Sequence, residues 1–145
     1  MIWIGIDPGA KGALGFISTG VTNVIPFDPS VYIFTLKSFK NADDCICCIE
    51  DVHSLPREGV TSAHRFGRTI GWLYGVLDTI GIPYQPIKPQ RWKAEFGLNS
   101  DKAQSVEVCK RLFPDISLLR TERSRKEDDN LAEAMLMALY AKRKL

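Results

Sequence analysis

The fold class is decided by the opening stretch Ile2-Trp3-Ile4-Gly5-Ile6-Asp7-Pro8-Gly9. Its first five residues are apolar or small, which indicates a buried β-strand, and the Asp-Pro-Gly sequence then ends the strand in a tight turn. A second strand over about residues 13–18 follows closely enough to pair with the first as a hairpin. The chain therefore begins with antiparallel strands, and the first of them ends in a carboxylate.

Three more strands are predicted further along the chain. The third lies between residues 21 and 36, and residues 31–36 are the most strand-like part of that region. The fourth, residues 45–50, is again apolar and again ends in an acid, and residues 84–87 form a short fifth strand between prolines. Right-handed crossover connections place the fourth and fifth strands parallel to the first.

Helices are predicted between and after these strands. Apolar residues recur at three- and four-residue steps over residues 61–80, as they do on one face of a helix. Pro89 can open a short helix, and the Ser-Asp pair at 100–101 can cap another that ends near residue 113. A final helix over residues 128–142 carries an apolar stripe.

Three glycines share one face of the helix over residues 61–80. Gly67, Gly71 and Gly75 recur at four-residue intervals, which predicts close packing against a neighbour. A membrane-dimer motif is excluded because Arg65 and Arg68 occupy the same helix.

The predicted order of elements indicates an α/β fold: a mixed five-stranded sheet, with an antiparallel three-strand meander plus two parallel strands, flanked by helices. The 145 residues, 45% hydrophobic and 25% charged, suit a single domain over residues 1–145. No apolar run reaches the roughly 18 residues of a membrane helix, and no basic leader precedes the first strand, so we expect a cytoplasmic protein with no membrane partner. The four cysteines lack the spacing of a zinc site and fit buried thiols in a reducing compartment.

The net charge of +2 conceals an uneven distribution of charge. Residues 57–126 hold 13 Lys and Arg against 7 Asp and Glu, an excess of +6, and the rest of the chain holds 6 against 10. A basic middle suggests a phosphate-rich partner. On charge alone, an ordinary solvated helix surface is an equally good interpretation.

Four carboxylates form a candidate site. Asp7 and Glu50 each end an apolar strand, and strand ends in α/β sheets line the crevice where ligands bind. Asp129 and Glu133 are spaced i and i+4, so they project from the same face of the last helix. Taken singly, Asp7 could instead form an Asx-turn, and Asp128 or Asp129 could simply be an N-terminal helix charge.

The chemistry of these residues points to a divalent cation. Oxygen-only ligands from carboxylates suit Mg²⁺, with Mn²⁺ able to substitute, and two such ions can promote hydrolysis of a phosphodiester. Competing chemistries lack their motifs: the sequence has no Walker-type loop, no G-x-S-x-G and no HExxH.

Three short stretches resemble the acidic motifs of the RuvC-type Holliday junction resolvases, particularly the short phage and bacterial relatives: Ile4-Gly5-Ile6-Asp7-Pro8-Gly9 with Gly12, Ile49-Glu50-Asp51-Val52, and Asp129-Asn130-Leu131-Ala132-Glu133-Ala134. Pro89-Gln90-Arg91-Trp92-Lys93 and Asp101-Lys102-Ala103 also look like the connecting region of that family. The resemblance runs over almost the whole chain, and the order and spacing of the motifs make it more specific than any one of them.

The resemblance implies an RNase H-like sheet and a metal site made of Asp7, Glu50, Asp129 and Glu133. It also implies a homodimer in which each subunit nicks one of two opposed strands of a four-way DNA junction. Many relatives carry a carboxylate or His where this chain has Asn130, so we choose Asp129 as the ligand and keep Asp128 as the rival.

The resemblance also bears on DNA contacts. His53 occupies a position where the family often has an aromatic that stacks on junction bases, although a loop histidine is more often merely solvated. Candidates for phosphate contacts are Arg57, Arg65, Arg68, Lys93 and Lys102, each of which could equally be ordinary surface charge. Trp72 and Trp92 fit packing better than base stacking.

The leading hypothesis from the sequence is a Mg²⁺-dependent endonuclease that resolves four-way DNA junctions in a bacterial or phage-infected cell. One alternative keeps the fold but cuts RNA–DNA hybrids or structured RNA. The other is a catalytically silent module that binds nucleic acid or, through the Asp7-Pro8-Gly9-x-x-Gly12 turn, a nucleotide.

Overall fold

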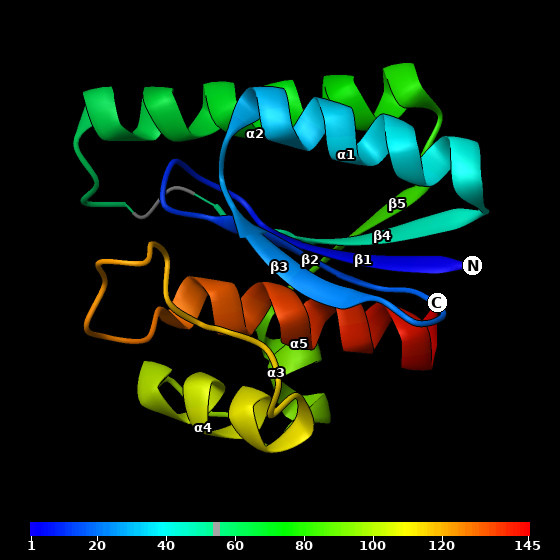
Figure 1. Cartoon of the computed structure of the whole chain (residues 1–145). Coiled ribbons are helices and arrows are strands. Elements are labelled where there is room, and N and C mark those ends of the chain that lie inside the picture. Colours follow the sequence, from blue (N-terminus) through cyan, green and yellow to red (C-terminus); the bar gives the residue numbers. More distant parts are fainter. Residues whose placement is uncertain (54–55) are drawn as a thin grey trace.

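The computed structural model describes residues 1–53 and 56–145, and Figure 1 shows their arrangement. Within these residues five strands form one sheet in the order β3-β2-β1-β4-β5. The strands are β1 (Ile2–Asp7), β2 (Ala13–Ile17), β3 (Thr22–Pro26), β4 (Cys45–Glu50) and β5 (Tyr84–Ile87). The helices are α1 (Pro29–Ala42), α2 (Val60–Ile80), α3 (Pro89–Glu95), α4 (Lys102–Leu112) and α5 (Asp129–Lys144).

The sheet combines both kinds of strand pairing. β1, β2 and β3 form an antiparallel meander, in which Asp7 lies opposite Ala13. β4 pairs in parallel with β1, and β5 pairs in parallel with β4. The predicted mixed five-stranded sheet is therefore confirmed.

Helices cover both faces of the sheet (Figure 1). Alternate residues of β1 divide between the two faces, so Ile2, Ile4 and Ile6 enter a core under α1 and α2. The other face packs on α5, and α3 and α4 lie outside α5. Because it is enclosed on both sides, α5 is buried all round over residues 131–138, more completely than the single predicted stripe requires.

Two glycines let α5 lie directly on the sheet. A Cβ added at Gly5 would lie 2.2 Å from the backbone nitrogen of Ala138, and one at Gly15 would lie 2.7 Å from the carbonyl oxygen of Ala134. Any side chain at Gly5 or Gly15 would therefore push the helix away. This close approach sets the height of α5 above the strand ends.

The prediction that residues 31–36 are the most strand-like part of their region was wrong. They belong to α1, while the third strand is the earlier β3. Asp28 caps α1 by accepting hydrogen bonds from the backbone nitrogens of Ser30 (3.0 Å) and Val31 (3.2 Å). Burial of Tyr32 and Leu36, one turn apart, outweighs the strand propensity of the β-branched and aromatic residues between them.

Among the residues that the structure describes, no helix combines the length and apolarity needed to span a lipid bilayer.

Candidate active site

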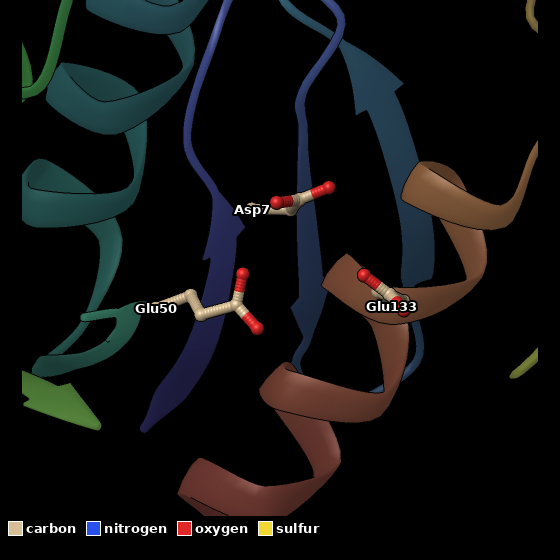
Figure 2. Close-up of side chains that lie close together, drawn as sticks. All are labelled: Asp7, Glu50 and Glu133. Atoms are coloured by element: carbon tan, nitrogen blue, oxygen red, sulfur yellow. The ribbon is translucent and has the colours of Figure 1, made fainter. Parts of the chain in front are cut away.

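Adjacent strands bring the first two carboxylates together. Ile6 of β1 pairs with Ile49 of β4 in parallel register, so Asp7 and Glu50, the next residue in each strand, reach the same edge of the sheet. Both side chains turn toward α5 (Figure 2), and both residues are buried, at 8% exposed.

The third carboxylate comes from the helix that lies over this edge. Glu133 projects from the second turn of α5 toward the two strand ends (Figure 2) and is 6% exposed. One oxygen from each of Asp7, Glu50 and Glu133 lies within 4.8 Å of the other two. We call these three residues the carboxylate cluster. The glycine contacts under α5 hold Glu133 at this height.

The electrostatics of the carboxylate cluster are unfavourable without a cation. Burial, followed by the nearby charges of Glu50, Glu133 and Asp129, holds the pKa of Asp7 well above its usual range, against a smaller opposing effect of Lys102. Burial also raises the pKa of Glu50, although a hydrogen bond from Trp92 partly opposes the rise. A bound cation would favour the ionised form of both groups.

Side chains from α3 and α4 also contact the carboxylate cluster. The buried indole of Trp92 donates a hydrogen bond from Nε1 to Glu50 Oε1 at 2.9 Å. Ser105 Oγ donates to Glu133 Oε1 at 3.3 Å, and Lys93 Nζ lies 3.4 Å from the same oxygen. Trp92 is therefore a core residue with a polar task that sequence reasoning missed, because the hydrogen bond joins residues 42 positions apart.

Asp129 stands beside the carboxylate cluster but is not one of its three members. Its side chain is 32% exposed, and Lys102 Nζ lies 3.5 Å from Oδ2. That oxygen is buried and accepts no hydrogen bond within the described residues. A buried carboxylate oxygen that accepts no hydrogen bond and has only the ion pair with Lys102, next to three converging acids, can bind a ligand.

Asp128 has a different task. It is the N-cap of α5 and accepts hydrogen bonds from the backbone nitrogens of Asn130 (2.8 Å) and Leu131 (3.4 Å). Burial alone would raise its pKa, but the hydrogen bonds from Arg120 and from the α5 backbone outweigh burial and lower it. The geometry favours Asp129 over Asp128 as a ligand, since the oxygens of Asp128 are already engaged.

Arg120 links the two halves of the site and was not singled out in the sequence. Its Nε donates to Asp128 Oδ2 at 2.7 Å, and its terminal nitrogen donates to the carbonyls of Lys11 and Gly12 in the β1–β2 turn. One side chain thus ties the start of α5 to the turn that follows Asp7. A basic residue in a polar loop gives no sequence signal for such a long-range contact.

The basic residues predicted to contact DNA divide into three groups. Lys93 and Lys102 lie beside the acids, and Lys93 is only 23% exposed. Arg65 and Arg68 are exposed on α2. His53 and Arg57 line a separate hollow, and the imidazole of His53 is 80% exposed with Asp51 3.8 Å away.

A cleft of about 670 Å³ opens next to the carboxylate cluster. Asp7 and the β1–β2 turn form one wall, and Arg65 and Phe66 of α2 form the other. Arg65 therefore shares a cleft with Asp7, while Arg68 lies in an adjoining hollow.

No protein-family model matches the sequence, and no curated protein matches it either. Solved structures do match. Thermus thermophilus RuvC in complex with a Holliday junction substrate superimposes with a TM-score of 0.62 and 16% identity, covering 99% of this chain and 97% of RuvC. The chain has the same fold as RuvC.

Two further structures extend the comparison. Another Thermus thermophilus RuvC structure gives a TM-score of 0.57 and 14% identity, covering 96% of this chain and 92% of that one. Ydc2, the yeast mitochondrial Holliday junction resolvase, gives 0.47 and 17%, covering 93% and 75%. The fold of the two Thermus thermophilus RuvC structures thus accounts for almost the whole chain, from β1 to α5.

Proposed function

We propose that this protein is a divalent-metal-dependent endonuclease that resolves four-way DNA junctions. The observation that carries the proposal is the carboxylate cluster: Asp7, Glu50 and Glu133, from three different elements, with oxygens within 4.8 Å of one another. The Thermus thermophilus structure that shares the fold contains RuvC bound to a Holliday junction substrate. The site and the fold therefore support the same activity.

The residues present fit Mg²⁺, with Mn²⁺ as a substitute. The donor set is made of carboxylate oxygens only, which hard divalent cations prefer. Three buried acids this close repel one another unless a cation lies between them. Oδ2 of Asp129, which accepts no hydrogen bond within the described residues, offers a fourth oxygen beside the cluster, so Asp7, Glu50, Glu133 and Asp129 are the proposed ligands.

Each part of the site has a task in phosphodiester hydrolysis. A divalent cation held by Asp7, Glu50, Glu133 and Asp129 would neutralise charge on the phosphate and would lower the pKa of an attacking water. Trp92 holds Glu50 in one orientation, and Ser105 together with Lys93 holds Glu133. The ammonium groups of Lys93 and Lys102 add positive charge beside the acids, where an incoming phosphate is attracted.

We further propose that the enzyme acts as a homodimer through the glycine face of α2, defined by Gly67, Gly71 and Gly75. All three are exposed, and a Cβ added at any of them meets nothing within 4 Å. Glycine at an exposed helix position lowers helix stability by about 1 kcal/mol relative to alanine. Three such glycines on one face therefore favour a partner chain that packs closely against the helix. Paired nicking of opposed strands requires two sites, which a second copy supplies.

The dimer has its own test. Gly71→Leu should shift the protein from dimer to monomer in sedimentation velocity, while Glu107→Leu, the same change at an exposed position of α4, should not. A wild-type protein that stays monomeric at high concentration would refute the dimer and leave the nuclease proposal intact.

The activity is tested with a labelled four-way junction, a linear duplex and an RNA–DNA hybrid, each with Mg²⁺ and with Mn²⁺. We expect paired cuts near the junction centre, no cutting of the linear duplex, and loss of activity in Asp7→Asn. Absence of cutting with both metals, or equal cutting by wild type and Asp7→Asn, refutes the proposal. Preferential cutting of the hybrid would replace the DNA junction as the substrate.

A further inference from the structure

Tyr32 of α1 places a hydroxyl group inside the core of the protein. The residue is 0% exposed, and its Oη forms no hydrogen bond within the part of the chain that the structure describes. A buried hydroxyl without a partner destabilises a fold, and a phenylalanine would fill the same space without that penalty. Buried hydroxyls are therefore nearly always paired, with protein atoms or with an ordered water molecule.

The ring of Tyr32 lies at the end of the sheet that carries the carboxylate cluster. Phe27 follows β3, and its backbone nitrogen donates to the carbonyl of Gly12 in the β1–β2 turn at 3.0 Å. The rings of Phe27 and Tyr32 meet edge to face, with centroids 5.3 Å apart. Because Asp7 directly precedes this turn, the aromatic pair lies near the end of β1, on the face opposite α5.

The electrostatic environment of the hydroxyl includes two residues of the site. Burial, followed by the nearby negative charge of Asp7, raises the pKa of Tyr32, against a smaller opposing effect of Arg120. The phenol therefore keeps its proton and is available as a hydrogen-bond donor. A carboxylate such as that of Asp7 is an acceptor of the complementary kind.

The hydroxyl and the carboxylate come to the end of β1 from opposite faces of the sheet. Tyr32 packs with Ile6 and Leu14 in the core under α1 and α2, whereas the side chain of Asp7 turns toward α5 (Figure 2). No direct hydrogen bond joins the two groups among the described residues. A buried water molecule can join polar groups that do not touch, and such a bridge is nearly as favourable as a direct hydrogen bond.

Resting on the proposed function, we infer that Tyr32 is a positioning residue for Asp7: its hydroxyl donates a hydrogen bond to one buried water molecule, which in turn donates to the Asp7 carboxylate. Glu50 and Glu133 accept direct hydrogen bonds from α3 and α4, and Tyr32 gives Asp7 a corresponding support from the other face of the sheet. Metal ligands that are held in one orientation bind the metal more tightly.

The first test removes only the hydroxyl. Tyr32→Phe should lower the Mn²⁺ affinity of the full chain about tenfold, measured by calorimetry, because hydrogen bonds that orient a metal ligand contribute about that much or more. Tyr140→Phe, the same change at a buried tyrosine of α5, is the matched control and should leave the affinity unchanged. Equal Mn²⁺ affinities in the two variants would overturn the inference.

The melting temperature of the metal-free protein gives a second readout. If the hydroxyl has no partner, its removal in Tyr32→Phe relieves a buried unpaired group, and the melting temperature should rise. If the hydroxyl holds a bridging water, its removal breaks a hydrogen bond and the melting temperature should stay level or fall. A rise above the wild type therefore also overturns the inference.

The third test detects the link between Tyr32 and Asp7 directly and without metal. The full chain is produced with 3-fluorotyrosine, and the fluorine resonance of Tyr32 is identified by its absence in Tyr32→Phe. Asp7→Asn should shift this resonance, because an amide replaces the carboxylate that accepts from the water. Asp115→Asn, at an exposed position, should not. A Tyr32 resonance that is the same in both variants would show that the ring only fills space.

These results are separable from the test of the proposed function. A Tyr32 resonance that responds to Asp7→Asn in a protein that cuts no junction refutes the nuclease and keeps the link between the two residues. Asp7-dependent cutting of junctions by a protein whose Tyr32→Phe variant binds Mn²⁺ as tightly as Tyr140→Phe leaves the nuclease and removes the role of Tyr32.

Discussion

Asp7 is the residue at which function and stability oppose each other most directly. Its carboxylate is buried among like charges, and its pKa is held well above its ordinary value, so folding disfavours its ionised form. The proposed phosphodiester chemistry needs the opposite state, an ionised oxygen that can bind a cation. A bound cation would resolve this conflict by favouring the ionised form.

This conflict leads to a prediction about Asp7→Asn. The amide keeps the size of the side chain and cannot ionise, so it avoids the cost of burying an acid among like charges, and the melting temperature of the metal-free protein at neutral pH should rise by a few degrees while nuclease activity is lost. Thermal unfolding followed by circular dichroism measures the shift. Asp115→Asn, at an exposed position, should change neither property, and a fall in the melting temperature of Asp7→Asn would contradict the account.

Trp92 offers a second prediction for a single side chain. Trp92→Phe keeps an aromatic ring in the core but removes the N–H that donates to Glu50. A hydrogen bond that orients a metal ligand contributes about tenfold or more to metal affinity, so we expect about a tenfold loss in Mn²⁺ affinity by calorimetry. Trp3→Phe is the control, and equal Mn²⁺ affinities in the two variants would show that Trp92 only fills space.

Residues of the site differ in how far they could be predicted from the sequence. Asp7 and Glu50 stand out because each is a lone acid at the end of an apolar strand, and helical spacing identifies Glu133. The sequence could not predict which of Asp128 and Asp129 caps α5 and which is available as a ligand. That depends on which carboxylate accepts hydrogen bonds from Arg120 and the helix backbone. Arg120 itself was missed for the same reason.

At the scale of elements, the site depends on the packing of α5 against β1 and β2. Gly5 and Gly15 allow the helix backbone to approach the strands, and Arg120 fastens its first residues to the β1–β2 turn. Sheet and helix therefore act as one unit in placing Glu133 opposite Asp7 and Glu50.

Gly5→Ala should disrupt the packing of α5 on the sheet. The new methyl would meet backbone atoms of Ala138 and Ala134 that cannot turn away, so we expect a loss of about 3 kcal/mol or more in the free energy of unfolding, measured in urea. Ile4→Val on the opposite face should cost only about 0.5–1.5 kcal/mol and leave Mn²⁺ affinity unchanged. If Gly5→Ala bound Mn²⁺ with the affinity of the wild type, the close packing of α5 on the sheet would not determine the geometry of the metal site.

The elements also show where sequence patterns fail. Four strands and four helices follow from apolar periodicity and caps, but α1 was mistaken for a strand because residues 31–36 are rich in β-branched and aromatic side chains. The Asp28-Pro29 pair was the available signal, since it combines an N-cap with a proline at the first helical position. Tertiary burial of Tyr32 and Leu36 decided the outcome.

For the whole molecule, the buried acids set the dependence of stability on pH. In the unfolded chain Asp7 titrates near 3.8, whereas in the metal-free folded protein its pKa lies well above that value. Within this window the folded state holds a proton that the unfolded state has lost, so the free energy of unfolding falls as pH rises, and it levels off above the folded pKa. The pKa of Asp128 is lowered instead. Its contribution to stability as the N-cap of α5 is therefore lost only in acid, as the pH falls through that lowered pKa.

We therefore predict that the melting temperature of the metal-free protein falls as the pH rises above 3.8, the ordinary pKa of Asp7, and stops falling above the raised pKa of the folded state. Saturating Mg²⁺ should flatten this fall, because binding favours the ionised acids and the unfolded chain has no site. Differential scanning calorimetry at several pH values, with and without Mg²⁺, measures both effects. A metal-free melting temperature that rises across this range, or a fall that Mg²⁺ leaves unchanged, would contradict the prediction.

The carboxylate cluster draws its members from residue 7 and residue 133, which lie near opposite ends of the sequence printed here. During synthesis on the ribosome, a nascent chain that has emerged only as far as α4 holds two of the three acids and has no helix over them. If the protein is the nuclease proposed above, such a polypeptide lacks one of the acids that cutting requires, and the site is complete only after α5 has emerged and packed on the sheet.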